Sequence, residues 1–250
     1  MKSALRSWER VTKLFAERHI LTIICISILL IPFILRFNLI AGEDNYYNIR
    51  IAESLLEKAS GKSVNGIYYD KLSYSGRDIV PTYGWPVLLV AFNKIFSIPY
   101  ELLAILLTLL FSLGSFLLFY SLIKNTENDV KLFSSLFLII SPAFLYLSTN
   151  SFSAVVFLML LSIYLIFRER IYPSLFAFAL IPFFSIFGAF VSLIAMLIYC
   201  LYIKRGKLFF KYLAAVFIAS LFYAPFLLKH GLPERLTFLT HETGIGYALK

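Results

Sequence analysis

Long apolar runs, separated by short polar segments, dominate the chain from about residue 20 onward. The run 20–41 carries a single charge, and the runs 102–123, 132–148, 152–167 and 212–228 carry none. At a rise of about 1.5 Å per residue, a helix of about 20 apolar residues crosses the hydrocarbon core of a bilayer. The pattern therefore predicts a series of membrane-spanning helices.

The apolar run 172–203 is too long for one crossing, because a single helix would extend over roughly 48 Å at about 1.5 Å per residue. Pro182 and Gly188 offer a break, and basic residues flank the run on both sides. Two passes return both basic clusters to the same side of the membrane, as the distribution of positive charge favours. We predict two short helices, 172–187 and 189–203, that break near Gly188.

The long polar stretch 42–84 follows the first apolar run. Apolar positions within 45–59 recur at helical spacing, and Gly61 is a typical C-terminal stop. We predict an amphipathic helix that lies on the outer membrane surface, with Asp44 as its N-cap. The following run 85–98 is too short to span and is predicted as an interfacial helix.

Composition agrees with this pattern. Hydrophobic residues make up 60% of the 250 residues, charged residues 15%, and the mean hydropathy is +0.83. Soluble domains average about 45–50% apolar and about 25% charged residues, so a soluble enzyme, a disordered regulator and a disulfide-stapled module are excluded. The predicted fold class is an all-α integral membrane protein, a polytopic bundle of about seven transmembrane helices in one domain, 1–250. The predicted spans are 20–41, 102–123, 132–148, 152–167, 172–187, 189–203 and 212–228, and the first outer loop, 42–84, carries the amphipathic helix.

The net charge is +9, and the distribution of the basic residues along the chain indicates how the protein is oriented. Lys and Arg are concentrated at the amino terminus and in the short loops near 124–131, 168–170 and 204–211. Because cytoplasmic segments of membrane proteins are enriched in basic residues, these segments are assigned to the cytoplasm. We predict a multi-pass protein of the cell membrane with a cytoplasmic amino terminus and a carboxyl terminus outside. The charge then reports orientation, and no nucleic-acid partner is expected.

Adjacent carboxylates begin the predicted outer loop. The loop reads Glu43-Asp44-Asn45-Tyr46-Tyr47-Asn48-Ile49-Arg50-Ile51-Ala52-Glu53, then Tyr69-Asp70-Lys71-Leu72-Ser73-Tyr74-Ser75-Gly76-Arg77, then Pro81-Thr82-Tyr83-Gly84-Trp85-Pro86. This order resembles the start of GT-C-type glycosyltransferases, and within that superfamily the catalytic subunits of archaeal and eukaryotic oligosaccharyltransferases. The resemblance extends over about residues 20–170 and includes 141–148 at the end of the third span.

The resemblance implies transfer of a sugar from a polyprenyl-phosphate-linked donor to an acceptor on the outer membrane face. Asp44 matches the acidic residue of the family's first loop, with Glu43 as its helper. The resemblance implies that Asp44 acts as a general base toward the acceptor hydroxyl, or as a ligand of Mg²⁺ or Mn²⁺. The outer basic residues that are candidates to bind the lipid phosphate are Arg77, Lys229, His230 and Arg235. The structural alternatives are an N-cap role for Asp44 and simple solvation for the basic residues.

Departures from the family pattern keep a second hypothesis open. The turn 149–153 has no carboxylate, whereas the oligosaccharyltransferases carry a second acidic motif there, and their W-W-D-x-G signature is not found in the sequence. The alternative is a non-catalytic GT-C-like membrane subunit or fragment that works with a second membrane subunit. A transporter or lipid flippase ranks third, because the predicted spans after the first carry no ionisable group.

Overall fold

The computed structural model describes the chain from Tyr83 to Tyr223 with short gaps, and parts of the region before it. Within the earlier region it describes the backbone of 43–59, 69–70 and 77–78, and a few helical positions between 26 and 34. Most of the first predicted span, 20–41, therefore lies outside the described residues. The predicted span 212–228 is described as far as Tyr223.

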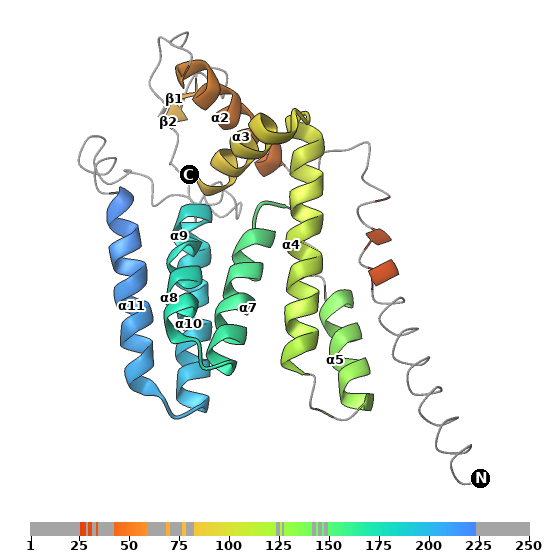
Figure 1. Ribbon diagram of the computed structural model, residues 1–250, viewed down its shortest axis with the longest axis vertical. Helices are drawn as coiled ribbons and strands as arrows, with labels where there is room; N and C mark the ends of the chain where they lie inside the picture. The colour runs from red at the N-terminus through yellow and green to blue at the C-terminus, as the bar shows by residue number, and fades with distance from the viewer. Residues whose placement is uncertain are drawn as a thin grey trace, which may run out of the picture.

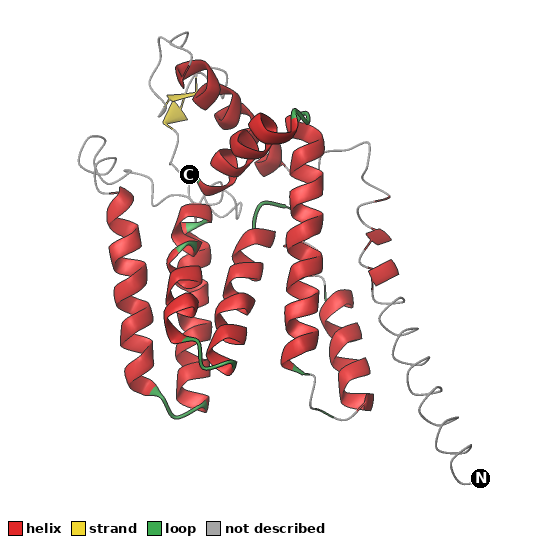
Figure 2. Cartoon of the chain, in the orientation of Figure 1, coloured by secondary structure: helices red, strands yellow, loops and turns green. Residues whose placement is uncertain are grey.

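Helices dominate the described chain (Figure 1). They are α2 (Glu43–Ala59), α3 (Gly84–Phe96), α4 (Tyr100–Leu122), α5 (Asn128–Ile140), α7 (Ser153–Phe167), α8 (Ile171–Ala179), α9 (Ile181–Phe184), α10 (Ile186–Tyr202) and α11 (Gly206–Ser220), which continues into the 3-10 turn η1 (Leu221–Tyr223). Strands β1 (Tyr69–Asp70) and β2 (Arg77–Asp78) form a short antiparallel ribbon. The predicted all-helical architecture is confirmed apart from this ribbon (Figure 2).

The longer helices after α3 stand side by side as a bundle, and α2, α3 and the ribbon lie across one end of it (Figure 1). We call this the capped end. The α7–α8 and α10–α11 turns lie at the opposite end, which we call the loop end. Two described helical segments, α4 and the continuous Gly206–Tyr223, are long and apolar enough to cross a membrane.

Small and hydroxyl-bearing side chains fill much of the bundle interior, whereas large apolar side chains cover its outside. Buried small residues are Ala104, Ser112, Ser115, Ala154, Ser162, Ser174, Ala177, Ala189 and Ser192. Exposed phenylalanines include Phe133, Phe137, Phe176, Phe187, Phe190, Phe210 and Phe217. Small residues allow close helix packing: a Cβ on Gly114 would lie 2.7 Å from the Phe157 ring. A helix that faces water has polar residues on its outer side. In this bundle the outer side is apolar instead, and hydroxyl groups lie in the interior.

Buried hydroxyl groups join α7, α8 and α11. Ser174 Oγ donates to the Ser162 carbonyl oxygen at 2.7 Å, and Ser162 Oγ donates to the Ser174 carbonyl oxygen at 3.1 Å. The Tyr212 hydroxyl lies 2.5 Å from Ser174 Oγ and acts as the donor, because the Ser174 proton is already used. Interhelical hydrogen bonds of this kind fix the register of helices in an apolar surrounding.

The break in the run 172–203 differs from the prediction. It lies at Ser185, which has an extended backbone and caps α10 by accepting a hydrogen bond from the Gly188 N–H at 2.9 Å. Gly188 itself lies in the first turn of α10, where a Cβ would come within 2.9 Å of Val155. The run is thus divided as predicted, but the break lies at Ser185, three residues before Gly188, and Gly188 serves close packing between α10 and α7. The segment before the break also divides, into α8 and α9.

Two helices extend into segments that the sequence assigned to loops. Helix α11 begins at Gly206, so Lys207 and Lys211 lie in its first turns with exposed side chains. Helix α5 begins at Asn128, and its Lys131 side chain is only 6% exposed. Charged residues interrupt an apolar run without interrupting a helix, because lysine is a good helix former.

Candidate functional site

Helix α2 is held on the capped end of the bundle by one face. Asn48, Ile49, Ile51 and Ala52 are buried, whereas Glu53 is exposed. The contacting cluster combines residues of four helices: Ile49 and Ala52 of α2, Trp85 and Leu89 of α3, Leu103, Ala104 and Leu107 of α4, and Ala154 of α7. Part of the predicted apolar face, Ile49, Ile51 and Ala52, is thus buried on protein. Packing fixes the position of α2 relative to the bundle.

The acidic pair occupies the first turn of this anchored helix. Because α2 begins at Glu43, Asp44 lies inside the helix rather than at the predicted N-cap position. The side chains of Glu43 and Asp44 lie outside the described ones. Their backbone positions put two negative charges at the amino terminus of α2. The unpaired amide groups at the amino terminus of a helix stabilise negative charge.

The predicted basic residues are only partly described. Arg77 begins β2, where it pairs with Asp70 of β1 in the antiparallel register. The ribbon lies at the capped end, so the structure brings the backbone of Arg77 to the same end as α2 (Figure 1). Lys229, His230 and Arg235 lie outside the described residues.

Helix α3 forms the second element of the capped end. Its Trp85 is 1% exposed, and the Trp85 ring lies 5.9 Å from the Phe111 ring of α4. At the other end of α3, Asn93 Nδ2 donates to the Ile98 carbonyl oxygen at 2.9 Å and closes the turn into α4. The predicted interfacial helix 85–98 is therefore an element packed against α2, α4 and α9.

The turn before α7 is closed by an amide where the resemblance leads one to expect a carboxylate. Asn150 is 5% exposed, and its Oδ1 accepts a hydrogen bond from the Phe152 N–H at 2.9 Å. The Asn150 carbonyl oxygen also accepts from the Ser153 N–H at 3.1 Å. Asn150 thus stabilises the turn through its own hydrogen bonds, as asparagine commonly does.

Buried polar atoms that sequence reasoning did not single out also lie on the helices of the capped end. Among the described side chains, Trp85 Nε1, the Tyr100 hydroxyl and Ser153 Oγ are buried without a hydrogen-bond partner. All three can donate a hydrogen bond to a ligand oxygen. Trp85 lies in a matched motif, but no spacing or periodicity in the sequence marks Tyr100 or Ser153. Their burial depends on contacts between helices far apart in the chain.

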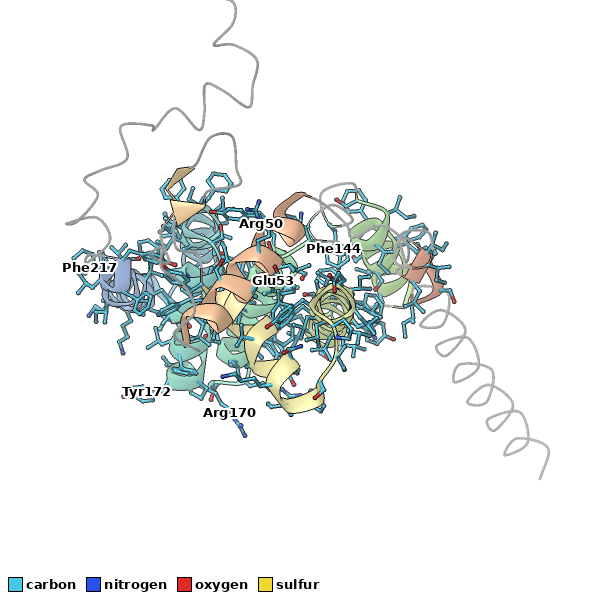
Figure 3. The ribbon with its side chains drawn as sticks, turned by 90° about the horizontal axis from the view of Figure 1, so that it is seen from above. Arg50, Glu53, Phe144, Arg170, Tyr172 and Phe217 are labelled. Atoms are coloured by element: carbon cyan, nitrogen blue, oxygen red, sulfur yellow. The ribbon has the colours of Figure 1, made fainter. Side chains whose placement is uncertain are left out.

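Seen from the capped end, α2 crosses over the bundle and carries Arg50 and Glu53 (Figure 3). Exposed aromatic residues such as Phe217 lie at the rim. Within the described residues, no group of three or more His, Cys, Asp and Glu side chains is placed to hold a metal ion. Comparison of the chain with protein-family models, curated proteins and solved structures found no match.

Proposed function

We propose that this chain is a polytopic protein of the cell membrane with about seven spans, whose capped end faces outside. The exposed phenylalanine, leucine and isoleucine side chains of α4, α5, α8, α10 and α11 support this assignment. Monomeric soluble proteins rarely expose contiguous apolar patches larger than a few hundred Å². Contact with lipid removes the cost of exposing this surface to water.

The distribution of charge supports the orientation. Arg168 and Arg170 lie in the α7–α8 turn, and Lys204 and Arg205 lie in the α10–α11 turn, so all four are at the loop end. Basic residues favour the cytoplasmic side. The capped end, with α2 and its acidic first turn, then lies outside, as does the carboxyl terminus.

We further propose that the chain is a GT-C-like membrane glycosyltransferase that uses a polyprenyl-phosphate-linked sugar. The observation that carries this proposal is the position of Glu43 and Asp44 in the first turn of a helix packed onto the capped end. A reacting carboxylate must be held in a fixed position, and the buried face of α2 holds this turn relative to the bundle. The site lies at the level where a lipid phosphate meets water.

The proposed reaction is a displacement at the anomeric carbon of the donor sugar. The acceptor hydroxyl oxygen forms a bond to this carbon, and the bond from the carbon to the phosphate oxygen breaks. Its electron pair leaves with the polyprenyl phosphate, and Asp44 takes the proton of the acceptor hydroxyl. Arg77, together with Lys229, His230 and Arg235, is proposed to bind the departing phosphate. Mg²⁺ or Mn²⁺, if the enzyme uses one, would be held by Asp44 with Glu43.

The second candidate function is a non-catalytic GT-C-like membrane subunit that works with a partner chain. The observation that favours it is Asn150, which closes the turn before α7 where the family has a second carboxylate. An amide cannot take a proton from an acceptor, and its oxygen here already accepts a backbone hydrogen bond.

Native mass spectrometry of the protein released gently from its own membrane separates these two functions. For the transferase we expect the chain alone, with a retained polyprenyl-phosphate-linked sugar. A chain held by a second subunit, without a donor lipid, would overturn the transferase assignment in favour of the subunit. The mass of the retained lipid also identifies the sugar and the polyprenyl length.

A further inference from the structure

Two turns at the loop end have the same backbone structure. After α7, Glu169 has a φ of 59°, its N–H donates to the Ile166 carbonyl oxygen, and the Arg170 N–H donates to the Leu165 carbonyl oxygen. After α10, Lys204 has a φ of 54°, its N–H donates to Leu201, and the Arg205 N–H donates to Cys200. Both are Schellman motifs, in which a left-handed residue ends a helix.

The repeated turn places an arginine at the same position twice. Arg170 is the N-cap residue of α8 and Arg205 that of α11, and neither side chain makes a capping hydrogen bond. Both side chains are exposed. Helices α8 and α11 pack on each other, so the two turns lie at the same end of the bundle (Figure 1). The fold thus places two exposed arginines at equivalent backbone positions at the loop end.

The surroundings of these arginines are basic and aromatic. The exposed basic residues are Arg168, Arg170, Lys204, Arg205, Lys207 and Lys211, and Glu169 is the only acidic residue between Leu161 and Tyr223. Tyr172 and Tyr202, beside the two turns, are 84% and 83% exposed. The Arg168 guanidinium lies over the Tyr164 ring, 5.3 Å from its centroid. Exposed tyrosines beside basic residues are typical of the level of lipid headgroups.

We propose that the loop end is a binding surface for anionic phospholipid headgroups, with Arg170 and Arg205 as its two equivalent anchors. Guanidinium groups bind phosphate oxygens through paired, charge-assisted hydrogen bonds. An anionic headgroup is favoured over a zwitterionic one, because the excess of positive charge at this end interacts with the net charge of the lipid. The proposal rests on the membrane location given under the proposed function, and it is independent of sugar transfer.

The test uses the full chain in detergent with equal amounts of phosphatidylglycerol and phosphatidylcholine, and native mass spectrometry counts the retained lipids. We expect the wild-type chain to prefer phosphatidylglycerol. In the double variant Arg170→Gln/Arg205→Gln this preference should fall about 25-fold, since each basic residue near a membrane surface contributes about fivefold. The control Lys94→Gln removes an exposed positive charge from the capped end and should leave the preference unchanged. An unchanged melting temperature of the double variant shows that it folds.

Equal retention of the two lipids by the wild-type chain would overturn this inference, as would a double variant that keeps its preference. Equal retention of the two lipids, together with a copurified acidic protein in the same mass spectra, would assign the surface to a protein partner and would also overturn the inference. Failure of the proposed function gives a different result from failure of this inference. A chain without a polyprenyl-linked sugar that still prefers phosphatidylglycerol contradicts the transferase assignment and supports the lipid surface.

Discussion

Replacing Asp44 by asparagine is expected to abolish sugar transfer while leaving the amount of protein in the membrane unchanged. Asparagine has nearly the same size and still accepts hydrogen bonds, but it cannot take the proton of the acceptor hydroxyl. Loss of a general base lowers the rate by about 10²–10⁴-fold. The loss of one negative charge in the first turn of α2 costs about 0.3–1 kcal/mol of helix stability, which is too little to unfold the protein.

The matched control is Glu53→Gln, which removes an exposed carboxylate from the same helix. We expect this variant to transfer sugar at the wild-type rate in membranes that contain the same amount of protein. The measurement is release of polyprenyl phosphate from the sugar-linked lipid. If Asp44→Asn releases it as fast as the wild-type protein, Asp44 has a structural role at the start of α2 and the catalytic assignment is wrong.

Replacing Gly84 by alanine is expected to loosen the capped end. The added Cβ would lie 2.8 Å from the Phe183 carbonyl oxygen and 2.9 Å from its carbonyl carbon. These are backbone atoms of α9, which is itself fixed, because the Tyr223 hydroxyl donates to the Pro182 carbonyl oxygen at 2.5 Å. Overpacking of this kind costs about 1–3 kcal/mol. Gly84 precedes Trp85, which is buried in the cluster that holds α2. We therefore expect a lower melting temperature, and slower sugar transfer because α2 is held less firmly.

Gly206→Ala is the control for this substitution. Gly206 begins α11 at the loop end, and a Cβ there would meet no atom within 4 Å. This variant should melt at the wild-type temperature or slightly above it, because alanine is a better helix former than glycine. Thermal unfolding of the two purified variants in the same detergent compares them directly. Equal melting temperatures would show that the contact between α3 and α9 does not stabilise the protein.

Two of the uninterrupted apolar runs predicted their helices well, whereas the predicted span 132–148 matches α5 only as far as Ile140. Helices α4 and α7 lie within two residues of the predicted segments 102–123 and 152–167, because nothing in these runs competes with the helix. The break at Ser185 was predicted three residues too late, because Pro182 and Gly188 are stronger local signals than a serine N-cap. Gly188 is used for contact with Val155, which no local pattern reports.

The candidate site was predictable only where a motif marks it. The pair Glu43 and Asp44 was found through a resemblance in residue order, and Asp44 lies in the first turn of α2 rather than at the predicted N-cap. The packing of α2 on α3 and α4 could not be predicted, since an amphipathic face fits a protein surface as well as a membrane surface. The burial of Trp85 likewise depends on the tertiary contact with Phe111.

We propose that the capped end and the loop end lie on opposite sides of the cell membrane, with the capped end outside. Single cysteines test it in a background of Cys25→Ala and Cys200→Ala. Lys94→Cys lies on α3 at the capped end and Lys207→Cys on α11 at the loop end, and both lysines are exposed. With a membrane-impermeant maleimide on intact cells, we expect labelling of the cysteine at position 94 alone, and labelling of the cysteine at position 207 only after permeabilisation. Labelling of both cysteines in intact cells, or of that at position 207 alone, would contradict the account.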